Sequence, residues 1–461
     1  MAYSDAFLDR IANTLQSSGL VKEVRYWGIL GISALAVAGI FALLLAISRI
    51  PGIENTFPWP IGFFEKGLVI HVIMSFVVWF LAIFGALMTV LTALAADSRP
   101  RLAFIGNPAI ALATTGFALL AIPAMLDRGE ASLNNYIPVI IDPLYYAGLI
   151  SFAASLVLIV VRFSANMTSA PMEIKPLMDA GAVCGLILIF ALTCFGLAYY
   201  PMADEVPSIR YNEDLFWGGG HVLQYLNTGL MLLGWYLLAA LVLNIEPVSR
   251  GRLRLVMGLC LIPAFGAPYL YGSYGAGTGE LMSAFTDMQY LMAPPVALLG
   301  FALIFMFAQH AIQGGKLWQD VAFVSIALSA VTFAIGGTLG LFVDGADTRT
   351  PAHYHAVIAA INLVFMGLFF RFLLPVMGRP VTLGRAVHWL LWLYAVGQMI
   401  ASVGLFLAGG YGAPRKTAGD AQGLEEIGAI AGLYMNGLGA LVAVIGGTMF
   451  IWVCARALLR R

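Results

Sequence analysis

Two histidines separated by one residue, His353 and His355, lie near the start of a long apolar segment over residues 351–376. Each residue of an α-helix advances about 100° around the axis, so residues two apart point to nearly opposite sides. One helix could therefore hold a metal centre on each side. Ionisable groups at membrane depth are costly and usually functional, but histidines near a helix end also reach interfacial water. The pair therefore indicates either two metal centres or an interfacial pair.

The composition identifies the kind of element that must position these side chains. The 461 residues are 61% hydrophobic and only 10% charged, with a mean hydropathy of +0.90. Ordinary soluble domains carry about 25% charged residues. The chain is therefore predicted to be a polytopic membrane protein. Its four cysteines all lie in apolar segments without a CxxC spacing, which gives no support to disulfides, structural zinc or covalently attached haem.

Apolar segments long enough to span a bilayer recur along the whole chain. Because lipid favours helices over open strands, and these segments are too long for barrel strands, they are predicted to be helices. We expect an all-α bundle forming a single membrane domain over residues 1–461, which begins with a short polar cytoplasmic N-terminus over residues 1–25. The twelve predicted spans are 27–48, 66–95, 103–125, 143–162, 178–200, 214–244, 253–273, 282–311, 318–343, 351–376, 385–409 and 428–455.

The basic residues predict the orientation of this bundle. An even number of spans puts both termini on one side, and most of the 24 lysine and arginine residues fall on that side. Cytoplasmic loops carry the excess of lysine and arginine in membrane proteins. Both termini are therefore predicted to be cytoplasmic.

With this orientation, most of the histidines share one depth. Imidazoles from separate helices at one level of a bundle are what haem ligation requires, so the shared depth favours haem over an interfacial role. Two histidines, His310 and His388, fall at cytoplasmic helix ends and are predicted to be interface residues. The four that lie within about two turns of the outer ends are His71, His221, His353 and His355.

Several motifs occur in a recognisable order. They are His71 within Val69-Ile70-His71-Val72-Ile73-Met74, then Trp217-Gly218-Gly219-Gly220-His221, Thr332-Phe333-Ala334-Ile335-Gly336-Gly337, His353-Tyr354-His355 and Gly412-Ala413-Pro414-Arg415-Lys416. Together they resemble subunit I of the haem-copper oxidase superfamily, the cytochrome oxidases and nitric oxide reductases. The resemblance covers nearly the whole chain.

The resemblance implies two haems, which we expect to be b-type, and a role for each matching residue. His71 and His355 would be the axial ligands of a low-spin haem, and His353 the ligand of a second haem. Arg415 and Lys416 would contact the haem propionates. At the copper position the matching residues are His221, which would be the metal ligand, and Tyr225, and both are candidate catalytic residues.

The chain also departs from the family pattern. The family has adjacent histidines in the seventh helix, but the region 263–272 contains none. Leu223 replaces a proton-delivering glutamate, and the eighth helix lacks the lysine of a proton pathway. Phenols and backbone oxygens are poor substitutes for the imidazoles that suit copper. We therefore expect little or no copper at His221 and loss of the family's proton channels, which leaves catalytic turnover open.

The expected function is that of a cytochrome c oxidase subunit I-like dihaem redox subunit in a bacterial inner membrane. By resemblance, a cytochrome c or cupredoxin-like donor at the outer face would supply electrons to the low-spin haem, which would pass them to the second haem. Other membrane subunits of a respiratory complex are expected as partners, and nucleic acid is not. Two alternatives are an electron-transfer or gas-binding haem subunit without oxygen reduction, and a secondary transporter, a class in which twelve helices are also common.

Overall fold

The computed structural model describes residues 5–49, 53–55, 59–96, 99–343, 345 and 347–460. In this part of the chain, twelve helices are long and apolar enough to cross a membrane, which confirms the predicted all-α fold class. Each predicted span overlaps one of them, and the ends differ by a few residues. For example, the first helix begins at Val21 where residue 27 was predicted, and the sixth begins at Ile209 where residue 214 was predicted.

The described residues pack into two compact units. The first comprises Met1–Gly31, Val77–Gly315 and Pro375–Gly378, and the second comprises Ile32–Phe76, Lys316–Leu374 and Arg379–Arg461. Helix α2 begins in the first unit and continues into the second. The single domain over residues 1–461 stays a prediction.

The first unit consists mainly of helices, with one small antiparallel hairpin that pairs Ala131 with Ile140 and Ser132 with Val139. Its elements are α1 (Asp5–Ser17), the start of α2 (Val21–Ser48), α4 (Trp79–Ala96), α5 (Gly106–Met125), β1 (Ala131–Ser132), β2 (Val139–Ile140), α6 (Pro143–Asn166), α7 (Lys175–Tyr199), α8 (Ile209–Leu243), α9 (Arg250–Tyr274), α10 (Gly279–Met288) and α11 (Ala293–Ile312).

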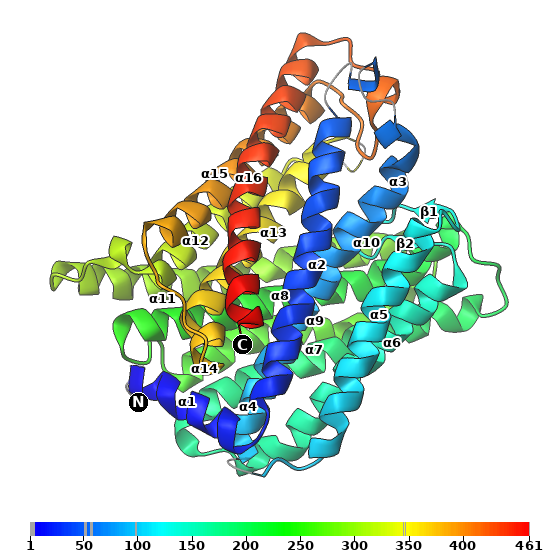
Figure 1. Ribbon diagram of the computed structural model, residues 1–461. Helices are drawn as coiled ribbons and strands as arrows, with labels where there is room; N and C mark the ends of the chain where they lie inside the picture. Colours follow the sequence, from blue (N-terminus) through cyan, green and yellow to red (C-terminus); the bar gives the residue numbers. More distant parts are fainter. Residues whose placement is uncertain are drawn as a thin grey trace. The chain divides into compact units, whose positions relative to one another are not determined.

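The second unit holds the remaining helices, and α15 and α16 run side by side in it (Figure 1). Among the described residues, two π-helical segments occur: Ile73–Val78, which begins in this unit directly after α3 and ends in the first unit, and Phe369–Leu373, directly after α13. The helices are α3 (Trp59–Val72), α12 (Val321–Gly340), α13 (Arg349–Leu368), α14 (Leu374–Val376), which is shared with the first unit, α15 (Arg385–Gly410) and α16 (Ile427–Leu459).

Short polar residues define where several helices begin. The Asp142 carboxylate accepts a hydrogen bond from Leu144 N (2.8 Å) and precedes a proline in the first turn of α6. Ser208 caps α8 in the same way, accepting from Tyr211 N at 3.1 Å. Each side-chain oxygen satisfies a backbone N–H that has no partner inside its helix. The start of α8 is therefore fixed by its own sequence, which positions His221 along it.

The N-terminal segment differs from the polar tail predicted over residues 1–25. It contains α1, and α1 packs against α4 within the first unit. The apolar positions Phe7, Ile11 and Leu15 are four residues apart, so they share one helix face, and all three are buried. Low average hydropathy concealed this amphipathic helix, because its polar residues occupy the other faces.

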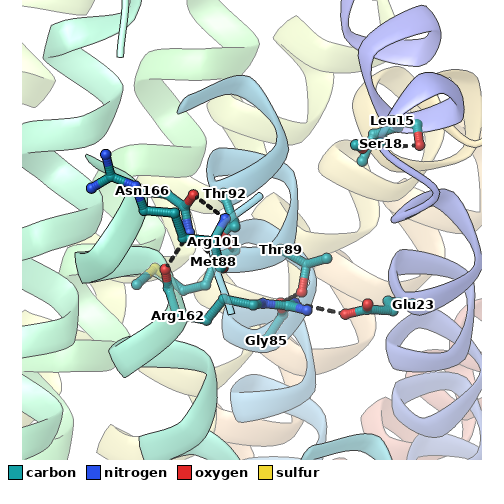
Figure 2. A network of polar contacts seen from close by, with 10 residues as sticks. All are labelled: Leu15, Ser18, Glu23, Gly85, Met88, Thr89, Thr92, Arg101, Arg162 and Asn166. Atoms are coloured by element: carbon teal, nitrogen blue, oxygen red, sulfur yellow. Dashed lines mark hydrogen bonds and ion pairs between the residues drawn. The ribbon is translucent and has the colours of Figure 1, made fainter. Parts of the chain in front are cut away.

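A buried ion pair joins α2 to α6 in the first unit, and Figure 2 shows Arg162 meeting Glu23 there. Arg162 Nη2 lies 2.6 Å from Glu23 Oε2, and the two side chains are 0% and 10% exposed. Gly106, the first residue of α5, closes over the pair, since an added Cβ would overlap both charged groups. The carboxylate therefore lies at the N-terminus of α5, where the helix dipole favours a negative charge.

Candidate functional site

Helix α13 carries His353, Tyr354 and His355 in its second turn, so the sequence prediction of a helical pair is confirmed. The ring nitrogen Nδ1 of His353 lies 2.7 Å from the carbonyl oxygen of Gly336 on α12. A Cβ added at Gly340 would lie 2.6 Å from the same nitrogen, so glycine is needed for this close approach. Because a carbonyl can only accept, Nδ1 carries the proton and Nε2 keeps its lone pair for a ligand.

His71 on α3 is held in the same manner. Its Nδ1 lies 3.0 Å from the carbonyl oxygen of Ala38 on α2, within the second unit. Nε2 again keeps its lone pair, because the only ring proton is on Nδ1, which donates the hydrogen bond to this carbonyl. The π-helical segment starts two residues later, and Ser75 Oγ donates to His71 O at 2.7 Å. Local π-helical turns are frequent at functional sites.

His355 lies close enough to His71 for their charges to interact. Its ring stacks on that of Tyr354, with 5.3 Å between the centroids and an interplanar angle of 26°. Two imidazoles from α3 and α13 thus come together in one compact unit. Axial ligation of a haem by two histidines requires such a pair.

Cationic residues lie beside this pair. The loop after α15 is attached to the start of α13 by a hydrogen bond from Thr348 N to Ala413 O (3.0 Å). This attachment brings Arg415 close enough to Tyr354 to interact with it electrostatically. Lys416 follows in a left-handed backbone conformation with φ of 61°. Arg415 and Lys416, the residues predicted to contact the haem propionates, therefore come directly after the point where the loop is anchored. Arg415 lies near Tyr354, between the two histidines in the sequence.

A further cation, Arg49, also interacts electrostatically with Tyr354 and with His355. Its guanidinium carbon lies 5.6 Å from the centre of the Phe64 ring, a cation–π arrangement. Burial lowers the pKa of this guanidinium, although arginine remains charged at neutral pH. The sequence alone indicates no role for Arg49, because a single arginine at the end of an apolar segment resembles an ordinary loop cation.

His221 on α8, in the first unit, has a different environment. Its Nδ1 lies 2.8 Å from the carbonyl oxygen of Trp217, and its Nε2 lies 2.8 Å from the hydroxyl of Tyr136. The residue is 1% exposed. Both ring nitrogens are therefore engaged by protein groups, whereas the rings of His71 and His353 each make one hydrogen bond among the residues that the structure describes. Tyr136 comes from the loop between β1 and β2.

The three glycines before His221 allow this packing. A Cβ at Gly220 would overlap Tyr136, one at Gly219 would overlap Phe195, and one at Gly218 would overlap Tyr271. Aromatic rings therefore pack against the turn of α8 that precedes His221. The glycine run that suggested a metal ligand in the sequence thus also serves close aromatic packing.

The other residues at the copper position do not assemble around His221. The Tyr225 hydroxyl, one turn further along α8, donates to the carbonyl oxygen of Met288 instead. On α9, Leu270 and Tyr271 stand in the region where the family pattern has histidines, and Tyr271 is buried. In the described ranges, no three His, Cys, Asp or Glu side chains are grouped so that they could hold a metal ion. These residues do not fit a copper ion.

The family model described as Cytochrome C and Quinol oxidase polypeptide I matches residues 22–445. The chain belongs to this family. The resemblance found in the sequence motifs is therefore confirmed, and the chain is a multi-pass membrane protein of the oxidase subunit I type. Members of the family carry haem and work in multi-subunit respiratory complexes.

Relatives of this oxidase-family chain have low sequence identity but extensive overlap. A cytochrome c oxidase subunit 1 of Thermus thermophilus is 24% identical, over 86% of this chain and 77% of its own. An uncharacterised protein of Aquifex aeolicus is 28% identical, over 75% of this chain and 83% of its own. A solved structure of a heme-copper terminal oxidase dimer has a TM-score of 0.77 at 16% identity, covers 96% of this chain and 84% of its own, and supports the fold.

Proposed function

We propose that this chain is the dihaem redox subunit of a respiratory complex, with His71 and His355 holding a low-spin haem and His353 holding a second haem. When bound, the two haems, both of b type, would supply one-electron transfer chemistry. One observation carries the proposal: Nδ1–H of His71 and of His353 each donates a hydrogen bond to a backbone carbonyl, which leaves Nε2 for a ligand. Metal-binding histidines are usually oriented by a hydrogen bond of this kind.

The cations near the histidine pair support the same proposal. Haem propionates are carboxylates, and charge-assisted hydrogen bonds to them are about twice as strong as neutral ones. Arg415 and Lys416 would supply these bonds, and Arg49 would add positive charge near His355. We further propose a cytochrome c or cupredoxin-like donor at the outer face, other membrane subunits as partners, and a bacterial inner membrane with both termini cytoplasmic.

A second candidate function is favoured by the environment of His221. Both of its ring nitrogens are engaged, and Leu223, at the position of the family's proton-delivering glutamate, has no proton to give. We propose that copper and the family's proton channels are absent and that the subunit transfers electrons or binds a gas without reducing oxygen. Copper would need several imidazole or thiolate ligands to compete with cellular chelators.

Haem and copper content test this function directly. We expect the purified protein to hold two b-type haems per chain and far less than one copper, measured by haem extraction, reduced-minus-oxidised spectra and elemental analysis. Absence of haem bands would contradict the haem assignment and restore the transporter alternative. Copper at one per chain, or oxygen consumption at ordinary respiratory rates, would instead restore the interpretation as an oxidase.

The proposed role of Arg415 predicts a change in redox potential. A nearby positive charge favours the reduced, less positive haem, so Arg415→Gln should lower a haem midpoint potential. Loss of roughly 1 kcal/mol of interaction corresponds to about 40 mV for a one-electron couple. Redox titration with optical detection measures the shift.

The matched control is Arg371→Gln, which removes the same charge further along the same membrane span. Arg371 is sixteen positions beyond His355, roughly 24 Å along a helix, and pairs with Asp320 at 3.6 Å. The haem midpoint potentials of Arg371→Gln should shift much less than those of Arg415→Gln. Equal shifts in both variants, or no shift in Arg415→Gln, would show that Arg415 is an ordinary solvated loop residue.

A further inference from the structure

Two exposed tryptophans stack on each other at one end of the second unit. Trp318 lies in the short 3-10 turn Leu317–Gln319 just before α12, and its ring centroid is 6.2 Å from that of Trp392 on α15, at an interplanar angle of 28°. Phe323 meets the Trp318 ring edge to face, with 5.0 Å between centroids. Trp318 is 59% exposed and Trp392 is 38% exposed. The stack therefore joins the start of α12 to the start of α15 and leaves much of its indole surface uncovered.

One face of α15 extends this uncovered surface. Arg385, Trp389 and Trp392 follow one another at spacings of four and three residues, so they share one side of the helix. Trp389 is 63% exposed, and Arg385 is exposed as well. Val396 and Val403 continue the same side further along the helix and are also exposed. This face of α15 therefore begins with a cation and is apolar along the rest of its length.

The charge beside the tryptophans is positive. Lys316 lies just before the stacked ring and Arg385 begins α15, and both residues are exposed. Asp320 is the one acidic residue in the described segments 316–320 and 379–392. Its carboxylate is already paired, at 3.6 Å, with an arginine of the π-helical segment that follows α13. A negatively charged ligand at this surface would therefore meet two cations and no unpaired carboxylate of these two segments.

We propose that Lys316, Trp318, Arg385, Trp389 and Trp392 form a binding site for one anionic phospholipid. The phosphate lies between the two cations, and one acyl chain follows the apolar face of α15. Indole rings are favoured at the level of lipid headgroups, where one part of the ring is apolar and the N–H can reach water. Basic residues at the same level attract anionic headgroups. The site matches both parts of the lipid, whereas a free phosphate ion has no apolar part to use the tryptophans.

Other arginines that lie near the ends of spans lack this combination. On α9, Arg250 and Arg254 both pair with Asp179, each at 2.8 Å, so their charge is partly neutralised within the protein. On α16, Arg456 follows the exposed Trp452 by one helical turn, but this is one ring on one helix. The proposed site instead combines cations and rings from two segments that lie side by side, which fixes their spacing before a lipid arrives.

Lipid binding by the full-length protein tests the site. The protein is purified in detergent, stripped of bound lipid and mixed with dioleoyl phosphatidylglycerol or dioleoyl phosphatidylcholine, and native mass spectrometry counts the lipids bound per chain. We expect one phosphatidylglycerol to bind roughly tenfold more tightly than phosphatidylcholine. This preference should disappear in Lys316→Gln/Arg385→Gln, which removes two exposed charges and no buried contact. Excess inorganic phosphate should leave the lipid bound.

The matched control is Arg252→Gln/Arg456→Gln, which also removes two exposed positive charges and should keep the preference. A second variant, Trp318→Ala, keeps both cations of the site but removes one stacked ring, so its affinity for phosphatidylglycerol should fall roughly threefold. Circular dichroism verifies that each variant is folded. Equal binding of the two lipids, equal loss of preference in the two double variants, unchanged affinity in Trp318→Ala, or displacement of the lipid by phosphate overturns the proposal.

Discussion

Replacing His71 or His355 with alanine should abolish the sharp α-band of a low-spin haem in reduced-minus-oxidised spectra. The two imidazoles belong to different helices, α3 and α13, yet lie close together in one unit. If the two histidines hold the haem as proposed, removing either would take away one of its protein ligands, and the haem would lose its low-spin character or be lost. His353→Ala should leave this band and remove the second haem instead.

His388→Ala serves as the control for these variants. His388 is in the first turn of α15, and its Nδ1 lies 3.3 Å from Gly384 O. It is roughly 33 Å, measured along the helix, from the end of α15 that precedes Arg415. The haem spectrum of His388→Ala should therefore match that of the unmodified protein. Because loss of a buried ligand also risks misfolding, each alanine variant should be tested for recovery of the band with added imidazole. A low-spin band that persists at full height in His71→Ala means that the ligand assignment is wrong.

The membrane-spanning helices could be predicted from the sequence because lipid imposes a simple requirement on them. A membrane helix must satisfy its own backbone and remain apolar for about twenty residues, so hydropathy alone reveals it. The shared depth predicted for His71, His353 and His355 rested on counting residues along helices whose direction was predicted from the basic residues. What remained hidden was the partner of each imidazole, such as Gly336 O or Ala38 O, since any backbone carbonyl has the same chemistry.

Tyr136 was missed for a different reason. It lies in a polar loop between two spans, and no periodic pattern indicates where such a loop will fold. Only the structure brings it to Nε2 of His221. The single detectable signal was the glycine run before His221, because consecutive glycines in a helix are unfavourable unless something packs closely against them. The run was interpreted as part of a metal-ligand motif, and it does not identify Tyr136 as the residue in contact.

The ion pair of Glu23 and Arg162 was hidden by the boundary of the first predicted span. The hydropathy pattern places that boundary at residue 27, which leaves Glu23 in the polar N-terminal segment. In the structure α2 begins at Val21, and Glu23 is buried. The same pattern places Arg162 at the cytoplasmic end of a span. A charged residue within a turn of a predicted end can thus be enclosed by neighbouring helices, here by Gly106 of α5.

Glu23→Gln should destabilise the protein by about 3–5 kcal/mol, because it leaves the charge of Arg162 buried and uncompensated. The Arg162 side chain is 0% exposed, so its charge has no contact with water in the folded protein. The matched control is Arg10→Gln, which breaks the ion pair with Glu173 at 3.1 Å, where both side chains are 61% exposed. Exposed pairs contribute about 0–1 kcal/mol. Denaturant unfolding in detergent, followed by tryptophan fluorescence, compares the two variants.

The double variant Glu23→Leu/Arg162→Met separates the cost of an unpaired charge from the contribution of the pair. Nε and Nη1 of Arg162 have no hydrogen-bond partner among the described residues, so burial of the pair carries a cost that its own attraction must offset. Replacing a buried ion pair with apolar side chains of similar size is often neutral or stabilising. The double variant should therefore be much more stable than Glu23→Gln. If the double variant is destabilised as much as Glu23→Gln, the ion pair itself stabilises the fold. If Glu23→Gln is destabilised as little as Arg10→Gln, water reaches the guanidinium of Arg162 and the predicted cost of an unpaired buried charge is wrong.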